Sequence, residues 1–311
     1  MQTILGAGGA IGTELAKALK KYTDQIRLVN RKPKKTNPDD ELLAADLLNA
    51  NETKKAVDGS SVVYLAVGLS YNAKIWEQQW PVIMQNVIDA CVLYEANLVF
   101  IDNMYLYDPD FLGQMTETTP IKPSSKKGHI RARIANMVMD KVESGELDAM
   151  IVRCADYYGP SIKNTSLITE TVFNNIANGK PAYWLGSANF KHSFTYTPDA
   201  GKATALLGNT DHAFNQVWHL PTASPPLTGR EWIEMISAEF NTDPKSRVIP
   251  KFIVRFMGLF MPVMRETVEM MYQYERDYVF DSSKFENQFD FTPTSYADGI
   301  LHIVQTDYRD G

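Results

Sequence analysis

Residues 2–19, QTILGAGGAIGTELAKAL, combine a short apolar run, a glycine-rich turn and a stretch of helix-forming residues. The glycines at positions 6, 9 and 12 would let the backbone turn tightly, approach a pyrophosphate and pack the helix against the strand. The first helical turn would offer N–H groups to the phosphates. The order therefore predicts a dinucleotide site that includes Gly6, Gly9, Ala10, Ile11 and Gly12. A turn that merely joins strand to helix is the alternative interpretation.

A second strand is expected over Gln25–Asn30, and the residues at its end bear on the choice of dinucleotide. In this fold an acidic residue at that position accepts from the adenosine ribose, whereas arginine accommodates a 2′-phosphate. Here the strand ends in Asn30 and Arg31, so no carboxylate repels a phosphate and a guanidinium is available to bind one. We predict NADP(H), with NAD(H) as the alternative cofactor. A solvated basic loop without a ligand is the other interpretation.

The following segments alternate between strand and helix, as expected of a doubly wound α/β sheet. Apolar runs predict strands over Leu42–Leu47, Ser61–Gly68, Leu98–Ile101 and Ala149–Cys154. Helical spacing predicts helices over Trp76–Tyr94 and Lys126–Glu143, with a loop over Asp102–Thr119. Ligands bind at the carboxyl ends of such strands, so Asp46, Leu47 and Gly68 become candidates for cofactor contact. Asp46 as a helix cap is the alternative.

Length and composition predict a folded protein with two parts. A chain of 311 residues with 44% hydrophobic and 22% charged residues suits one large domain and a smaller lobe. We expect an NAD(P)-binding domain over residues 1–160, to which segments near 190–220 return, and a smaller mixed lobe over residues 161–311. The returning segments would include strands over Lys191–Tyr196 and Asn215–Leu220, after a helix over Leu167–Asn178.

The charge and the apolar runs limit the partners. A net charge of −6 gives no attraction to nucleic-acid phosphates, so a small molecule is the expected partner. No signal peptide or run of eighteen apolar residues is evident, which predicts a cytoplasmic protein without a membrane partner. Cys91 and Cys154 show no metal-ligand spacing and are expected to be buried thiols. The apolar run Phe252–Val263 is expected to be a buried helix or pocket wall, with a membrane-surface or partner helix as the alternative.

In their order, these landmarks resemble the extended short-chain dehydrogenases/reductases, the NAD(P)-dependent epimerase/dehydratase superfamily. The resemblance covers nearly the whole chain and rests on Gly6-x-x-Gly9-x-x-Gly12, Asp46-Leu47, Ala66-Val67-Gly68, Asn86-Val87, Tyr157-Tyr158-Gly159-Pro160 and Phe194-Thr195-Tyr196-Thr197-Pro198-Asp199. It implies a Rossmann fold with an NAD(P) cofactor, and it adds Ala66 and Val67 to the cofactor candidates. It also implies a possible homodimer through the helices Trp76–Tyr94 and Lys126–Glu143.

The catalytic residues of this family are a Ser or Thr after the fifth strand and a Tyr-x-x-x-Lys on the next helix, where Lys lowers the pKa of Tyr. This chain departs from both. Asn103 stands at the hydroxyl position, where an amide can still polarise a carbonyl. The helix entry has no tyrosine: either Lys127 is retained opposite Pro123, or Ser124 replaces Tyr and Gly128 replaces Lys. We prefer Lys127, because it keeps a cation at the nicotinamide ribose.

The missing tyrosine leaves the proton donor open. Tyr105, close to Asn103, is the best substitute phenol, with Lys127, Asp102 and His129 behind it; an aromatic packed under the loop is the alternative. Members that bind nucleotide-sugars often place an arginine against the diphosphate, and that position resembles His192 here. His192 and Tyr157 are therefore substrate candidates, with a structural histidine as the alternative.

The leading hypothesis is an NADP(H)-dependent oxidoreductase that transfers hydride to or from a small organic carbonyl or alcohol. Asn103, Tyr105 and Lys127 would supply the polarising and proton-transferring groups. An epimerase or dehydratase of sugar type with catalytic NAD is a second hypothesis. A non-catalytic NADP(H)-binding redox sensor or regulator is the third, because Tyr-x-x-x-Lys is missing.

Overall fold

The computed structural model describes residues 1–162 and 165–309, and the chain forms two compact units. The first unit comprises Met1–Leu106, Lys126–Cys154 and Pro198–Leu220. The second comprises Tyr107–Ser125, Ala155–Thr197 and Pro221–Gly311. Each unit is thus assembled from three separate stretches of the chain.

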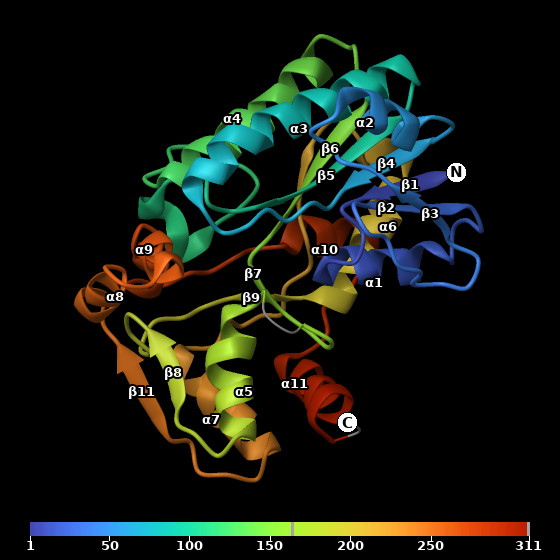
Figure 1. Cartoon of the computed structure of the whole chain (residues 1–311). Helices are drawn as coiled ribbons and strands as arrows, with labels where there is room; N and C mark the ends of the chain where they lie inside the picture. The colour runs from blue at the N-terminus through green and yellow to red at the C-terminus, as the bar shows by residue number, and fades with distance from the viewer. Residues whose placement is uncertain (163–164, 310–311) are drawn as a thin grey trace. The chain divides into compact units, whose positions relative to one another are not determined.

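The first unit is built on a seven-stranded parallel sheet with the order β10-β6-β5-β4-β1-β2-β3 (Figure 1). The strands are β1 (Gln2–Leu5), β2 (Ile26–Asn30), β3 (Glu41–Ala44), β4 (Val62–Leu65), β5 (Asn97–Asn103), β6 (Ala149–Cys154) and β10 (Val217–His219). The order runs outward from β1 in both directions, which places the switch point between β1 and β4. The predicted doubly wound Rossmann sheet is confirmed.

Apolar residues that are buried on both faces explain the inner strands. Every residue of β4 and β6 is buried, whereas β3 at the edge is largely exposed. β5 extends further than predicted, because Asp102 pairs with Arg153 of β6 and Asn103 pairs with Cys154. The predicted loop from Asp102 is therefore wrong at its start, and both residues belong to the sheet.

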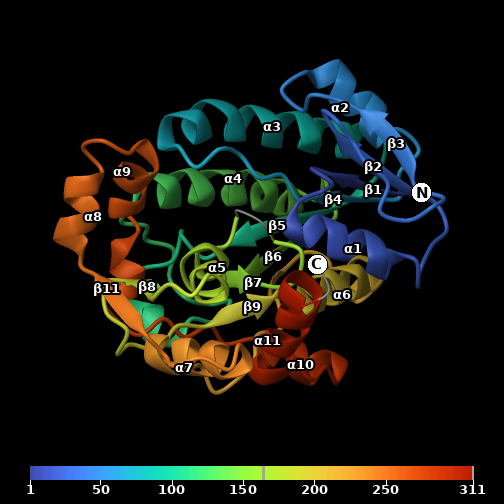
Figure 2. The ribbon, with the colours of Figure 1, turned by 60° about the horizontal axis from the view of Figure 1, so that its bottom comes forward.

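Helices of the first unit cover the sheet. They are α1 (Ala10–Leu19), α2 (Ala50–Val57), α3 (Ala73–Leu93), α4 (Lys126–Glu143) and α6 (Thr197–Gly208). The side chains of Asn49 and Asn72 cap α2 and α3. Figure 2 shows α3 and α4 running side by side, and these helices contact each other. On α6, a Cβ at Gly201 would lie 2.6 Å from the backbone of Glu14, so α6 packs closely on α1.

The second unit combines two small sheets with short helices. β7 (Asp156–Tyr158) pairs with β9 (Phe194–Tyr196), and β8 (Ala182–Leu185) pairs with β11 (Ser246–Ile249). The remaining elements include a π-helical turn (Thr169–Phe173), α5 (Asn174–Ala177), α7 (Gly229–Glu239), α8 (Lys251–Met257), α9 (Pro262–Val268), α10 (Ser283–Phe289) and α11 (Tyr296–Val304). A core of aromatic side chains holds them, in which Tyr158 and Phe194 both pack edge-on against Trp232.

Two predictions for the second half of the chain need correction. The strand near Lys191–Tyr196 pairs with β7 and does not join the main sheet, because Phe194–Tyr196 is buried among the aromatic residues of the second unit. The run Phe252–Val263 is not one buried helix. It forms α8, a turn and the start of α9, and most of its large apolar side chains are exposed.

The two cysteines are free and buried, as predicted. Burial raises the pKa of the Cys91 thiol, which makes it a poor nucleophile. Within residues 1–162 and 165–309, no helix has both the length and the apolar character needed to cross a membrane.

Candidate active site

The turn between β1 and α1 has the backbone geometry that a bound pyrophosphate requires. Gly6 has a φ of +89°, and a Cβ there would lie 2.6 Å from the Cα of Val67 and 2.8 Å from the carbonyl carbon of Ala66. Gly8 has a φ of +92°, and a Cβ there would meet no atom within 4 Å. Only glycine adopts such φ values at little cost. The turn therefore passes closely over the end of β4 while its other side stays open.

The first turn of α1 supplies donors for an anion. Gly9 is the N-cap residue, and no side chain caps the helix. The first backbone hydrogen bond of the helix runs from the Thr13 N–H to the Gly9 carbonyl, at 2.9 Å. The N–H groups of Ala10, Ile11 and Gly12 precede that bond and point along the helix axis. The glycine turn and the uncapped N-terminus of α1 therefore offer backbone N–H groups that fit the pyrophosphate of a dinucleotide.

The end of β2 is fastened to the glycine turn. The Nδ2 of Asn30 donates to the carbonyl of Ala7 at 2.6 Å, a structural role that the sequence did not reveal. Arg31 is exposed, and no ion pair ties its guanidinium to a carboxylate in the described part of the chain. The buried carboxylate of Asp40 accepts from the N–H of Asn37 at 2.6 Å and so closes the loop. Arg31 therefore lies on a loop that the Asn37–Asp40 hydrogen bond holds together, and no carboxylate of the described residues pairs with its guanidinium.

The other cofactor candidates follow β3 and β4. Asp46 is exposed, and its Oδ1 accepts from the Leu48 N–H at 3.1 Å. It is not the cap of α2, which is Asn49, so that alternative is wrong. Leu47 is buried, and its carbonyl accepts from Nδ2 of Asn86 at 2.9 Å. Asp46 can thus face a ligand, whereas Leu47 belongs to the core.

Ala66, Val67 and Gly68 form the exit from β4. The Ala66 N–H donates to the Leu5 carbonyl at 2.8 Å, so the segment still lies beside the end of β1. A Cβ at Gly68 would meet nothing within 4 Å. Ala66 and Val67 lie against Gly6 of the glycine turn, at the carboxyl ends of the two central strands.

Asn103 ends β5 and presents an amide. Its Oδ1 accepts from the Tyr105 N–H at 3.1 Å, so the carbonyl of the amide shapes the loop. Its Nδ2 has no acceptor among the described residues and remains a donor. One half of the Asn103 amide therefore caps the loop, and the other half can donate to a ligand oxygen.

Asp102 forms ion pairs with two arginines, Arg131 and Arg153. Its carboxylate is buried, and Oδ1 lies 2.5 Å from Nη2 of Arg131 while Oδ2 lies 3.4 Å from Nε of Arg153. The Arg131 guanidinium also lies over the ring of Trp80 at 4.6 Å. These ion pairs fasten α4 to β5 and β6. His129 is exposed on α4, whereas Lys127 and Arg131 of the same helix are buried.

Lys127 is not a surface lysine, because its side chain is fully buried. Its Nζ lies 4.4 Å from the ring centroid of Tyr71, which follows the exit from β4. Tyr71 packs edge-on against Trp76, and Trp76 stacks with Tyr105 at 6.4 Å. A buried ammonium is costly unless it is compensated, and aromatic faces compensate it. The structure therefore joins Lys127 and Tyr105 through two aromatic residues that the sequence reasoning missed.

In the second unit, His192 is enclosed by aromatic rings. It is 2% exposed and stacks between Tyr274 at 4.6 Å and Tyr278 at 4.3 Å. Its Nε2 lies 3.0 Å from Oδ2 of Asp156, which also accepts from the Tyr274 hydroxyl at 2.9 Å. The side chain of Asp156 is 23% exposed. Asp156 is thus the polar group that a ligand can reach, and Tyr157 beside it is half-buried.

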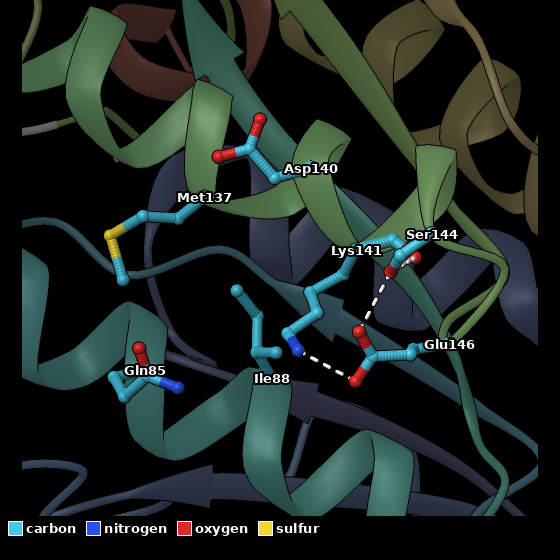
Figure 3. Close-up of a pocket in the computed structure, with 7 residues that line it drawn as sticks. All are labelled: Gln85, Ile88, Met137, Asp140, Lys141, Ser144 and Glu146. Carbon is cyan, nitrogen blue, oxygen red and sulfur yellow. Dashed lines mark hydrogen bonds and ion pairs between the residues drawn. The ribbon is translucent and has the colours of Figure 1, made fainter.

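A hollow of about 330 Å³ lies away from the glycine turn (Figure 3). It is lined from α3, α4 and the turn after α4 by Gln85, Ile88, Met137, Asp140, Lys141, Ser144 and Glu146. Glu146 accepts from Lys141 and from Ser144, so three polar groups on the α4 side of the hollow pair with one another. The hollow contains none of the candidate catalytic residues. It lies on the pair of helices for which a homodimer contact is expected.

Comparison with protein families gives a match over residues 3–217 to the NAD dependent epimerase/dehydratase family. The chain belongs to this family, a nicotinamide-dinucleotide-dependent group of the extended short-chain dehydrogenase/reductase superfamily. Comparison with curated proteins gave no match.

Solved structures show the same fold. A double mutant of a dTDP-glucose 4,6-dehydratase from Streptomyces venezuelae, with NAD and DAU bound, is 18% identical and has a TM-score of 0.80, covering 100% of this chain and 97% of its own. The UDP-glucose 4-epimerase of Thermus thermophilus, in complex with NAD, is 17% identical with a TM-score of 0.78, covering 99% of each chain. The UDP-glucuronic acid 4-epimerase of Bacillus cereus, also with NAD, is 17% identical with a TM-score of 0.78, covering 98% and 97%.

Proposed function

We propose that the first unit binds NADP(H) and that the protein transfers hydride between it and the carbonyl or alcohol carbon of a small organic substrate. The observation that carries this proposal is the buried Lys127, held against Tyr71 in an aromatic row that ends at Tyr105. A cation is kept out of water there at considerable cost. Such a group is expected where a phenol must give up or take a proton.

The residues of the glycine turn, with the first turn of α1, would hold the pyrophosphate, and Arg31 would hold the 2′-phosphate. Bound there, the nicotinamide supplies or accepts the hydride. Among residues 1–162 and 165–309 no carboxylate pairs with Arg31, which supports the choice of NADP(H) because none of them competes with a phosphate for the guanidinium. NAD(H) is the alternative, and the structural neighbours described above contain NAD.

The proton would pass between the substrate oxygen and a phenol. In the direction of reduction, the carbonyl oxygen gains the hydroxyl proton of Tyr105 or Tyr71 while Nδ2 of Asn103 donates a hydrogen bond to that oxygen. Lys127 would stabilise the phenolate that remains, through its charge. In the direction of oxidation, the same phenolate would take the proton from the alcohol.

For the second unit we propose that Asp156 and Tyr157 contact the substrate and that His192 positions Asp156. His192 is too enclosed to be a principal ligand contact, and its bond to Oδ2 fixes the carboxylate. A carboxylate repels a diphosphate, so this arrangement favours a substrate with hydroxyl groups and no phosphate. We also propose a homodimer through α3 and α4, which analytical ultracentrifugation can test.

A sugar-type epimerase or dehydratase is the second candidate, and it is favoured by structural neighbours that are enzymes of that type. In that case the cofactor would be oxidised and reduced again within one turnover and would stay bound during purification. Released cofactor identified by mass spectrometry therefore discriminates the two: tightly retained NAD favours the second candidate, and readily exchanged NADP(H) favours the first.

The direct test is NADPH consumption across a panel of aldehydes, ketones and enones, with wild type, Lys127→Ala and Lys126→Ala. Lys126 is exposed one residue away and serves as the matched control. We expect turnover in wild type and Lys126→Ala, and loss of at least about a hundredfold in Lys127→Ala with cofactor binding largely kept. Unchanged turnover in Lys127→Ala would refute the proposed role. No turnover with any substrate, together with NADP(H) binding, would indicate a redox sensor.

A further inference from the structure

The segment from α8 to the start of α9 exposes large apolar side chains in close succession. The exposed fractions are 71% for Phe252, 64% for Phe256, 73% for Leu259, 76% for Phe260, 46% for Met261 and 57% for Val263. Single apolar residues on a surface are ordinary, but a contiguous group of this kind marks an interaction site. None of these exposed side chains belongs to the aromatic core of the second unit.

The segment is folded, so the exposure is not that of a loose chain. Val254 is fully buried and anchors α8, while the rings of Phe256 and Phe260 meet at 5.8 Å. A Cβ at Gly258 would lie 2.9 Å from the Cα of Arg265, so α8 and α9 approach closely at the turn. The tight turn presents its apolar side chains together, outward from the anchor.

Basic residues outnumber acidic ones along this segment and the strand before it. Residues 245–266 contain five basic side chains and a single acidic one, Glu266 of α9, in a chain whose net charge is −6. The basic residues are Lys245, Arg247, Lys251, Arg255 and Arg265, all exposed. Lys251 pairs with Glu275 at 3.2 Å, Arg255 and Arg265 lie on α8 and α9, and Lys245 and Arg247 lie at β11 just before α8. The local charge is therefore opposite to that of the protein as a whole.

We propose that α8, α9 and the turn between them dock on an anionic membrane surface. The apolar tip would enter the boundary between headgroups and acyl chains, and the basic residues would contact lipid phosphates. A second copy of the chain fits less well, because a two-fold contact would bring the two positive surfaces together. α8 and α9 are far too short to span a bilayer, so the protein would lie on the membrane. This proposal replaces the expectation of no membrane partner.

Sedimentation of the full-length protein with lipid vesicles tests the proposal. Vesicles of phosphatidylcholine alone are compared with vesicles that also contain phosphatidylglycerol. We expect at least about tenfold tighter binding to the anionic vesicles, weakened by added salt. The double variant Phe256→Glu/Phe260→Glu should lose binding, and Arg255→Ala should weaken it about fivefold. Phe111→Glu, at a 48% exposed phenylalanine outside the segment, is the matched control and should bind as wild type does.

The substituted residues are exposed, so the Tm of all three variants should equal that of the wild type. A lower Tm would reveal a folding defect, which is thereby distinguished from a loss of membrane binding. Equal binding to both vesicle types, or no binding to either, would overturn the proposal. The proposal would also be overturned if analytical ultracentrifugation showed a dimer for the wild type and the other variants but a monomer for the double variant. The surface would then be covered by a second copy of the chain.

Discussion

Gly6 and Gly8 offer a test of the glycine turn, because the two residues share a conformation and differ in their surroundings. Their φ values are +89° and +92°. Replacement by alanine imposes the same backbone strain at both positions, roughly 1–2 kcal/mol. Only at Gly6 would the new Cβ meet the backbone, 2.6 Å from the Cα of Val67.

The magnitudes follow from that difference. For Gly8→Ala we expect a loss of unfolding free energy of about 1–2 kcal/mol, from backbone strain alone. For Gly6→Ala we expect a loss of about 3–5 kcal/mol of unfolding free energy, because the backbone at Ala66 and Val67, which follows β4, must also move. Each kcal/mol lowers Tm by roughly 2–4 °C in domains of comparable size.

Differential scanning calorimetry without added cofactor measures both variants, and Gly68→Ala provides a control with open space at the Cβ position and no positive φ. Its Tm should fall least. An equal fall for Gly6→Ala and Gly8→Ala would refute the reasoning, since the turn would then yield without disturbing β4. Cofactor titration of the folded variants should show weaker binding in Gly6→Ala than in Gly68→Ala.

Other predictions concern single contacts. Arg31→Ala should weaken NADP(H) binding by roughly 10–100-fold and NAD(H) binding much less, measured by fluorescence titration; equal losses would exclude a 2′-phosphate contact. Asp102→Asn should cost about 3–5 kcal/mol of unfolding free energy, because it leaves the buried Arg131 without its partner carboxylate; a change below 1 kcal/mol would show that the ion pair is dispensable. A thiol reagent should label neither Cys91 nor Cys154 in the native protein and both after denaturation; rapid native labelling would contradict their burial.

Local pattern predicted the sheet well. The inner strands are short apolar runs that are buried on both faces. Such a run can be recognised from a few consecutive residues, without knowledge of the rest of the chain. α4 has the predicted bounds, Lys126–Glu143, because its helical spacing is uninterrupted. The strand–turn–helix at Gly6 was also predictable, since glycine alone permits its backbone geometry.

Contacts between distant residues account for what local pattern did not reveal. Lys127 meets Tyr71, and His192 meets Asp156, across dozens of residues that carry no sign of the pairing. The pairing of β9 with β7 likewise depends on aromatic packing from several segments. The run Phe252–Val263 was predicted as a buried helix because apolar content alone does not distinguish a core helix from an exposed apolar segment.

The sheet of the first unit has a consequence for the protein during synthesis. β6 is buried along its whole length, and its outer neighbour β10 comes from residues 217–219, far downstream. Between Cys154 and Leu220 the growing chain carries an uncovered apolar strand edge, for about 3–13 seconds at the roughly 5–20 residues per second of translation. Such an edge can pair with other chains. Newly made protein should therefore depend on chaperones in this interval, and fragments that end before β10 should aggregate.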